Sequence, residues 1–158
     1  MRFEERFRVG QSEQQVWDLF ESSAEQVGMC IPGAESVTAV APDTYRVVIT
    51  QKVGSVGATF DLKAELRNKQ PTAAFEIHAV GRSIKGARGD MRAKAVVRLI
   101  GDGTGTDVEL DADVALGGML GSLGHKVIVK KAEEVTADFA VALAALVHGG
   151  PTIGDVSG

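Results

Sequence analysis

Apolar and polar side chains alternate strictly along residues 106–116, where Val, Leu or Ala occupies every second position and Asp or Glu fills most positions between. Successive side chains of a strand point to opposite faces, so this pattern predicts a strand with one buried and one solvated face. Such a strand belongs to a sheet that needs a cover on one side. The longest apolar-faced helical pattern follows directly, after Gly117. The sequence therefore predicts a sheet covered by a C-terminal helix.

Six further segments show the same strand pattern, and short turn signals separate most of them. They are residues 2–9, 35–41, 45–53, 58–67, 72–80 and 90–100. Tight connections of this kind join antiparallel neighbours, so we expect a seven-stranded antiparallel sheet in an α+β fold. Residues 81–89 are interpreted as a glycine-bearing loop, and residues 101–105 as a hairpin turn.

Helices are expected at two places. Ser12 with Gln15 has the spacing of a capping box and begins a short helix, and a second short helix starts at Ser22 or Ser23 and ends near Gly28. The long C-terminal helix carries apolar residues at intervals of three and four, which form one stripe. The stripe consists of Leu120, Leu123, Val127, Ala132, Val135, Phe139, Leu143 and Leu146.

Composition narrows the class of protein. The chain has 158 residues and a net charge of −4, which suits one domain and argues against a nucleic-acid surface. A single cysteine, Cys30, fits a reducing compartment, and neither a signal peptide nor an apolar run long enough to span a membrane is evident. We expect one domain over residues 1–148, a disordered tail at residues 149–158, and a cytoplasmic location.

Residues for catalysis are scarce. The three histidines share no metal-ligand spacing, so no metal site is expected, and Cys30 is interpreted as a packed side chain in the turn at 30–33. The glycines of 117–121 lack the rest of a phosphate-binding motif; they allow a flexible start of the helix, close packing on the sheet or a mobile edge of a cavity. No catalytic residue is assigned.

Two charged segments remain. The acidic row of 107–113 is interpreted as a solvated strand face, with Arg92, Lys94 and Arg98 as basic neighbours on the adjacent strand. Residues 82–88 place three basic side chains around Ile84. This segment is either an ordinary loop or a contact for anionic lipid or an acidic partner.

Several motifs resemble those of the CoxG family of carbon monoxide dehydrogenase subunits, within the START-like (SRPBCC, helix-grip) superfamily. The matching segments are CIPGA at 30–34, KVG at 52–54, Val16-Trp17, Gly105-Thr106, the glycine-rich stretch 117–124, and Phe139 with Leu143. The resemblance covers about residues 1–147. It implies a helix-grip fold, in which the seven-stranded curved sheet wraps around the long C-terminal helix and encloses a cavity.

The family resemblance also implies a function. Members are associated with a molybdenum CO dehydrogenase or a related molybdenum hydroxylase, with its attachment to the inner face of the cell membrane, and with binding of lipophilic quinones. A C-terminal extension that reaches the membrane is typical of the family, and this sequence does not contain one. The leading hypothesis is a non-catalytic carrier that holds a quinone, with menaquinone as the expected species, for electron transfer from the dehydrogenase.

The expected wall of the cavity combines inward-facing strand residues with residues of the helices. Its members are Trp17, Phe20, Val47, Ile49, Phe60, Leu62, Phe75, Ile77, Met91, Ala93, Met119, Leu120, Leu123 and Val127. Expected mouth segments are 54–57, 81–89 and 117–124. Small inward residues, namely Ala64, Ala73, Ala93 and Ala112, either leave space under the helix or let it pack closely.

Two other functions stay open at this point. A recruitment or maturation factor for the dehydrogenase needs a closed core and no ligand. An enzyme needs polar side chains that face the cavity, and Glu5, Tyr45 and Gln51 are the candidates that the strand pattern provides.

Overall fold

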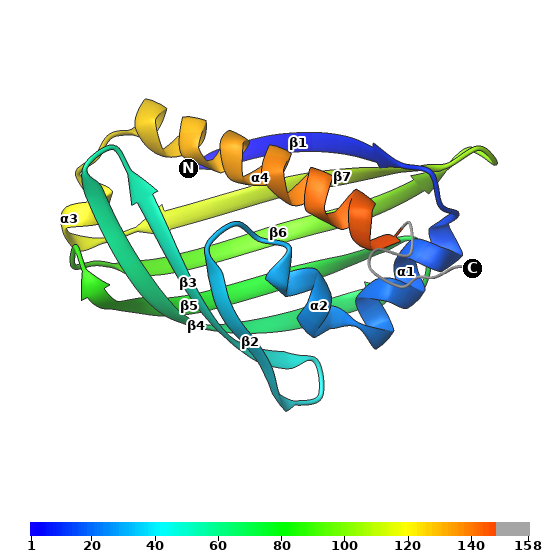
Figure 1. The fold of residues 1–158 in the computed structure, drawn as a ribbon, viewed down its shortest axis with the longest axis horizontal. Coiled ribbons are helices and arrows are strands. Elements are labelled where there is room, and N and C mark those ends of the chain that lie inside the picture. The colour runs from blue at the N-terminus through cyan, green and yellow to red at the C-terminus, as the bar shows by residue number, and fades with distance from the viewer. Residues whose placement is uncertain (148–158) are drawn as a thin grey trace.

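The computed structural model describes residues 1–147 as one curved antiparallel sheet with helices on its concave side (Figure 1). The predicted boundary at residue 148 and the predicted disorder of 149–158 lie outside the described residues. The strands are β1 (Arg2–Val9), β2 (Ala34–Ala41), β3 (Thr44–Val53), β4 (Val56–Gln70), β5 (Ala74–Gly86), β6 (Asp90–Gly101) and β7 (Thr106–Leu116). The helices are α1 (Glu13–Ser22), α2 (Ala24–Met29), α3 (Gly118–Gly121) and α4 (His125–Val147).

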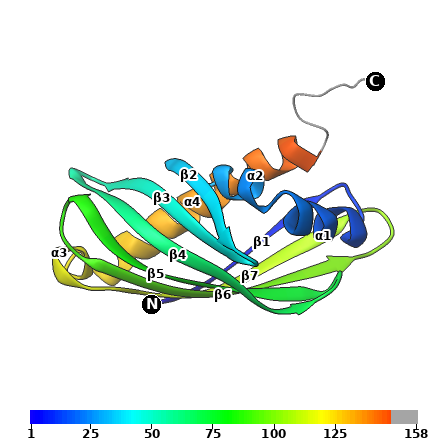
Figure 2. The same ribbon diagram turned by 90° about the horizontal axis from the view of Figure 1, so that it is seen from below.

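The strand order is β1-β7-β6-β5-β4-β3-β2, and every neighbouring pair is antiparallel. Strands β2 to β7 follow one another through tight connections, while β1 closes the far edge beside β7. Figure 2 shows α4 lying across the concave face, with α1 and α2 beside its C-terminal half. The seven-stranded α+β prediction and the helix-grip arrangement are therefore confirmed.

Local sequence explains the two short helices. The Ser12 hydroxyl accepts a hydrogen bond from the Gln15 amide at 3.2 Å, and the Gln15 side chain accepts one from the Ser12 amide at 2.9 Å. This reciprocal pair is the predicted capping box, and it satisfies two backbone donors at the start of α1. Ser23 ends α1 and precedes α2, close to the predicted break between the helices.

The predicted loop at residues 81–89 is wrong, because β5 continues to Gly86 and the connection to β6 is short. Gly81 is a strand residue here, where the backbones of β4 and β5 approach closely. A Cβ atom at this position would lie 2.1 Å from the Asp61 carbonyl oxygen. Glycine is therefore required for strand packing, while the pattern suggested a turn. The pairing of β4 with β5 shifts between Thr59 and Phe60, so Ile84 is an extra residue of β5 between the paired residues Ser83 and Lys85.

The acidic row of β7 lies on the solvated face, as predicted, but its ion pairs are made with β1. Arg2 binds Asp111 at 2.6 Å, Arg6 binds Glu109, and Arg8 binds Asp107 at 3.1 Å. The predicted basic neighbours on β6 are present as well, since Arg98 lies opposite Glu109 and Lys94 opposite Asp113. Strand β1 flanks β7 on the other side, and the antiparallel register sets its arginines directly beside these carboxylates.

Helix α4 is anchored through its C-terminal half. Leu143 is fully buried, Thr136 is 9% exposed, and the ring of Phe139 meets Phe7 of β1 edge-on, with ring centroids 6.2 Å apart. The predicted apolar stripe is correct in this half. Val127, which the stripe included, is 46% exposed, because the sheet-facing positions of the first turns are Ile128 and Val129.

Replacement of Leu143 by alanine tests this anchor. The change removes a fully buried side chain, so we expect the free energy of unfolding to fall by about 2–5 kcal/mol. Val141→Ala on the same helix is the matched control, because Val141 is 73% exposed and its loss changes stability by less than about 0.5 kcal/mol. Urea unfolding measures both. Similar stabilities for the two variants would contradict the anchor.

Candidate functional site

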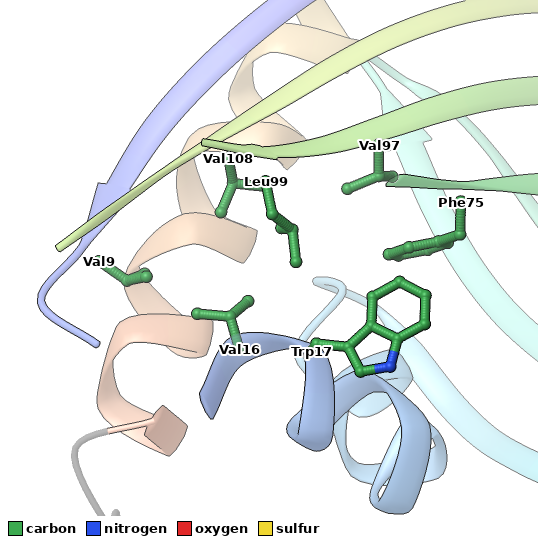
Figure 3. Close-up of a cluster of buried hydrophobic side chains, with 7 residues drawn as sticks. All are labelled: Val9, Val16, Trp17, Phe75, Val97, Leu99 and Val108. Carbon is green, nitrogen blue, oxygen red and sulfur yellow. The ribbon is translucent and has the colours of Figure 1, made fainter. Parts of the chain in front are cut away.

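The buried apolar side chains form two separate clusters on the concave face. The first lies at the α1 end, where Trp17 packs edge-on against Phe75 with ring centroids 6.0 Å apart (Figure 3). Phe20 approaches the same Phe75 ring, with the centroids 5.0 Å apart. Its buried members are Val9, Val16, Trp17, Phe75, Val97, Leu99 and Val108. This aromatic cluster holds α1 and the end of α4 against β5, β6 and β7.

The second cluster lies toward the opposite end, under α3. Its buried members are Val47, Ile49, Ala58, Phe60, Leu62 and Leu120. Met91, Leu116 and Leu123 are partly buried against it. Leu120 links α3 to the β3 and β4 strands, which fixes the segment that precedes α4.

A row of small side chains crosses the sheet next to the second cluster, against which Ala64 packs. The strand register aligns Ala64 of β4 with Ala79 of β5 and then with Ala93 of β6. We call these three residues the alanine row. All three face α4, yet each is only half-buried, as are Tyr45 and Val114 at the two ends of the row. These residues do not reach the full burial of Ala58 and Ala112, which are each 4% exposed, so this part of the sheet stays partly accessible to solvent.

The facing half of α4 shows the same incomplete burial. Its first three turns contain no fully buried side chain, and the sheet-facing residues Ile128, Val129, Ala132 and Val135 keep partial exposure. The α4 backbone comes close to β1, β3 and α1, and it stays farther from the central strands. Two apolar surfaces thus face each other without full contact. We call this region, between the alanine row and the N-terminal half of α4, the open interface.

The residues predicted to form the ligand wall divide among these regions. Trp17, Phe20, Phe75 and Ile77 belong to or pack on the first cluster, and Val47, Ile49, Phe60, Leu62, Met91, Leu120 and Leu123 belong to or pack on the second. Ala93 lies in the alanine row. Met119 and Val127 point to solvent, at 58% and 46% exposure.

Several residues of the open interface were absent from the predicted wall. They are Ala64, Ala79, Ile128, Val129, Ala132 and Val135. Ala64 had been identified as a small inward residue, and alternation predicts the same for Ala79, but their alignment in one row depends on strand register. Of the other small residues considered, Ala112 is 4% exposed and Ala73 lies outside the strands.

Two cavities found among residues 1–147 lie elsewhere. One, lined by Trp17, Phe20, Leu66, Phe75 and the side chains of Glu21 and Lys69, has a volume of about 10 Å³, which is room for a single water molecule. The aromatic cluster is therefore solid core. The other is a depression of about 290 Å³, lined mainly by charged residues of β1, β6 and β7, and its chemistry does not suit an apolar molecule.

The polar residues that were candidates for catalysis lie on different strands. Gln51 of β3 donates a hydrogen bond to the Pro32 carbonyl oxygen at 2.5 Å, so its amide fixes the turn before β2. Burial raises the pKa of the Tyr45 phenol, and Asp43 raises it further. Glu5 belongs to β1 at the other edge of the sheet, where burial and then the charge of Glu133 raise its pKa.

The surroundings of Cys30 and His78 indicate structural roles for both residues. The Cys30 thiol lies 3.5 Å from the Gln26 carbonyl oxygen, and burial raises its pKa, which disfavours the reactive thiolate. His78 lies 2.8 Å from Glu76 on the outer sheet face. His148, the third histidine, is outside the described residues. Among residues 1–147, no cluster of three potential metal-binding side chains is present.

The family model for CoxG, a subunit of carbon monoxide dehydrogenase, matches residues 6–147, which include the second half of β1, the other six strands and the whole of α4. The chain belongs to the CoxG family. The resemblance drawn from the CIPGA and KVG segments is thereby confirmed. No curated protein sequence matches the chain. No helix within residues 1–147 of this CoxG family member has the length and apolar character needed to cross a membrane.

Solved structures support the same fold. A conserved protein from Geobacillus kaustophilus is similar with a TM-score of 0.83 and 17% identity, over 94% of this chain and 95% of that one. A START superfamily protein from Mycobacterium smegmatis has a TM-score of 0.68 and 14% identity, over 93% and 97% of the two chains. The Zhui aromatase/cyclase from Streptomyces sp. R1128 has a TM-score of 0.60 and 16% identity, over 94% and 92%. These similarities establish the START-like fold.

The raised pKa of the Glu5 carboxyl group can be tested through the pH dependence of stability. Its pKa is raised in the folded protein, so the native state holds a proton more readily than the unfolded chain, whose ordinary value is 4.5. Stability therefore falls as the pH rises from about 4.5 through the native pKa. We expect Glu5→Gln to raise the melting temperature at pH 7, and this gain to vanish below about pH 4.5.

Glu4→Gln is the control for this experiment, because Glu4 faces solvent on the same strand and the substitution removes the same charge. Calorimetry at a series of pH values compares the two variants. A constant difference between them from pH 4 to pH 8 would show that Glu5 does not titrate differently in the folded state.

Proposed function

We propose that this protein is a non-catalytic carrier, which binds the apolar tail of a quinone, with menaquinone as the best candidate, in the open interface. The observation that carries the proposal is the partial exposure of apolar residues on both facing surfaces, next to the well-packed second cluster. Exposed apolar surface inside a folded domain is unfavourable, and an apolar ligand would cover it.

The composition of the open interface suits a chain-like ligand. Alanine side chains on the sheet leave space for a flexible tail, and Ile128, Val129 and Val135 supply apolar contact from the helix. Each buried methylene group contributes about 0.8 kcal/mol, so a few isoprenoid units provide most of the binding free energy. Polar recognition is then needed only at the head group.

Membership of the CoxG family supports a carbon monoxide dehydrogenase as the partner. In this proposal the carrier brings the quinone to that enzyme, or to a related molybdenum hydroxylase, as electron acceptor, and works at the inner face of the cell membrane. A non-catalytic role agrees with the positions of Glu5, Tyr45 and Gln51, which do not converge on one reacting centre: Glu5 lies on β1, and the other two lie on β3 at the far side of the sheet.

The rival role is recruitment or maturation of the dehydrogenase without any ligand. Both roles predict a complex with the enzyme, and they differ in the open interface. A recruitment factor gains nothing from unsealed apolar surface, whereas a carrier depends on it.

Ala93→Leu tests the carrier role, because it adds a larger side chain in the middle of the alanine row. If the space is open, the variant remains at least as stable as the wild type, and its affinity for a short-tailed menaquinone in detergent micelles falls by about tenfold or more. Ala115→Leu is the matched control, since Ala115 is exposed on the outer face of β7. This variant should bind menaquinone as the wild type does.

Two results would contradict the proposal. Wild-type protein that shows no quinone or other lipid by mass spectrometry after extraction, and no rise in melting temperature with added menaquinone, is not a quinone carrier. A loss of about 1–3 kcal/mol of stability in Ala93→Leu would show that the region is already filled. Complex formation with the dehydrogenase from delipidated extract, without any ligand dependence, would support the recruitment role.

A further inference from the structure

Three connections meet at the end of the molecule opposite α1 (Figures 1 and 2). They are the β3–β4 turn at 54–55, the β5–β6 connection at 87–89, and the segment 117–124 that leads through α3 to α4. The Ala87 amide donates a hydrogen bond to the Gly57 carbonyl oxygen at 2.8 Å, and the Gly117 amide donates one to the Asp90 carbonyl oxygen at 3.0 Å. These bonds fix the connections as one surface, which we call the α3 end.

Large apolar side chains project into solvent at the α3 end. Ile84 is 56% exposed, Met119 is 58% exposed, and Val127 is 46% exposed. They come from β5, α3 and the first turn of α4, three elements that the fold brings together here. A single exposed apolar residue needs no explanation, but three at the tips of one end indicate a surface that contacts something apolar.

Basic residues lie on the strands, connection and helix that meet at the α3 end. Lys52, Lys85, Lys126 and Lys130 are exposed and Arg88 is nearby in the β5–β6 connection, and within residues 1–147 none of the five forms an ion pair. Elsewhere in residues 1–147, basic residues of both kinds occur: Arg2, Arg6, Arg8, Arg46 and Lys69 form ion pairs, whereas Lys63, Arg82, Arg92, Arg98 and Lys131 form none.

Acidic residues are few at this end. Asp90 lies at the start of β6 beside Gly117, and the exposed Asp113, near the end of β7, pairs with the Met1 amine at 3.3 Å. Asp61, farther along β4, is held by Arg46 at 2.8 Å. The chain as a whole carries a net charge of −4, so its charge is distributed unevenly and the α3 end is locally positive. Such a surface attracts an anionic partner.

We propose that the α3 end docks on an anionic lipid bilayer, with Ile84, Met119 and Val127 inserted among the lipids and the basic side chains on the head groups. Apolar tips within a ring of lysine and arginine side chains are typical of peripheral membrane binding. A protein partner explains the surface less well, because protein interfaces are depleted of lysine, and four of the five basic residues here are lysines.

This inference deepens the proposed function, and it rests on that function for one step, the route of the ligand. The unsealed half of α4 is its N-terminal half, which begins at the α3 end. Docking by this end therefore sets the open interface next to the membrane. A quinone tail could then pass between the bilayer and the protein without crossing water.

Vesicle sedimentation tests the docking surface on ligand-free, full-length protein. Vesicles of phosphatidylglycerol and phosphatidylcholine should bind the wild type, and neutral phosphatidylcholine vesicles should bind it much less. Each neutralised basic contact should weaken binding by about fivefold, so the triple variant K85Q/R88Q/K126Q should lose roughly a hundredfold. I84S/M119S should weaken binding too, and its effect should persist in high salt, which screens only the charges.

The matched control is K63Q/K94Q/R98Q, which removes the same charge from the outer sheet face. Docking by the α3 end predicts a loss of less than about fivefold for this variant. Equal losses in the two triple variants, or no binding of the wild type to anionic vesicles, would overturn the proposal. Loss of dehydrogenase binding in K85Q/R88Q/K126Q, with vesicle binding unchanged, would overturn it in favour of a protein contact.

Failure of the membrane-docking proposal can be distinguished from failure of the quinone-carrier proposal. Menaquinone binding in detergent micelles depends on the open interface alone, so K85Q/R88Q/K126Q should bind menaquinone as the wild type does. Ala93→Leu, in turn, should bind vesicles normally while it binds menaquinone poorly.

Discussion

The packing of the C-terminal half of α4 against β1 and α1 is the interaction on which the rest of the structure depends. Leu143, Thr136 and Phe139 fix this half of the helix, and the aromatic cluster around Trp17 and Phe75 supports it from below. The N-terminal half of α4 continues across the sheet, and its first three turns contain no fully buried side chain. Leu120 fixes the segment before this half of the helix, but the strands present alanines where the helix crosses, so the apolar residues of both surfaces stay partly exposed.

This arrangement reconciles a stable fold with an apolar surface left partly exposed. Two packed clusters stabilise the domain, and the alanine row next to the second one contributes little to stability. The side chains that could bind a ligand are therefore separate from those that hold the fold together. Membership of the CoxG family and the START-like architecture agree with such a division, and the chemistry of the open interface suits an isoprenoid tail.

Much of the fold was predictable from the sequence, because alternation over residues 106–116 and the capping box at Ser12 are local signals. The errors have tertiary causes. Gly81 was interpreted as part of a loop, although a close approach of two strands requires it, and the ion pairs of Asp107 and Glu109 with β1, a strand distant in sequence, were not predicted. The site was less predictable, since periodicity identifies inward residues but neither strand register nor the distance between helix and sheet.

Methyl NMR on protein labelled at alanine tests the central claim most directly. With menaquinone added, nuclear Overhauser effects from the isoprenoid tail should reach the methyl groups of Ala64, Ala79 and Ala93. The methyl group of Ala115, on the outer face, should show none. Effects confined to outer-face alanines, or unchanged spectra of the alanine row at saturating menaquinone, would contradict a binding space beneath α4.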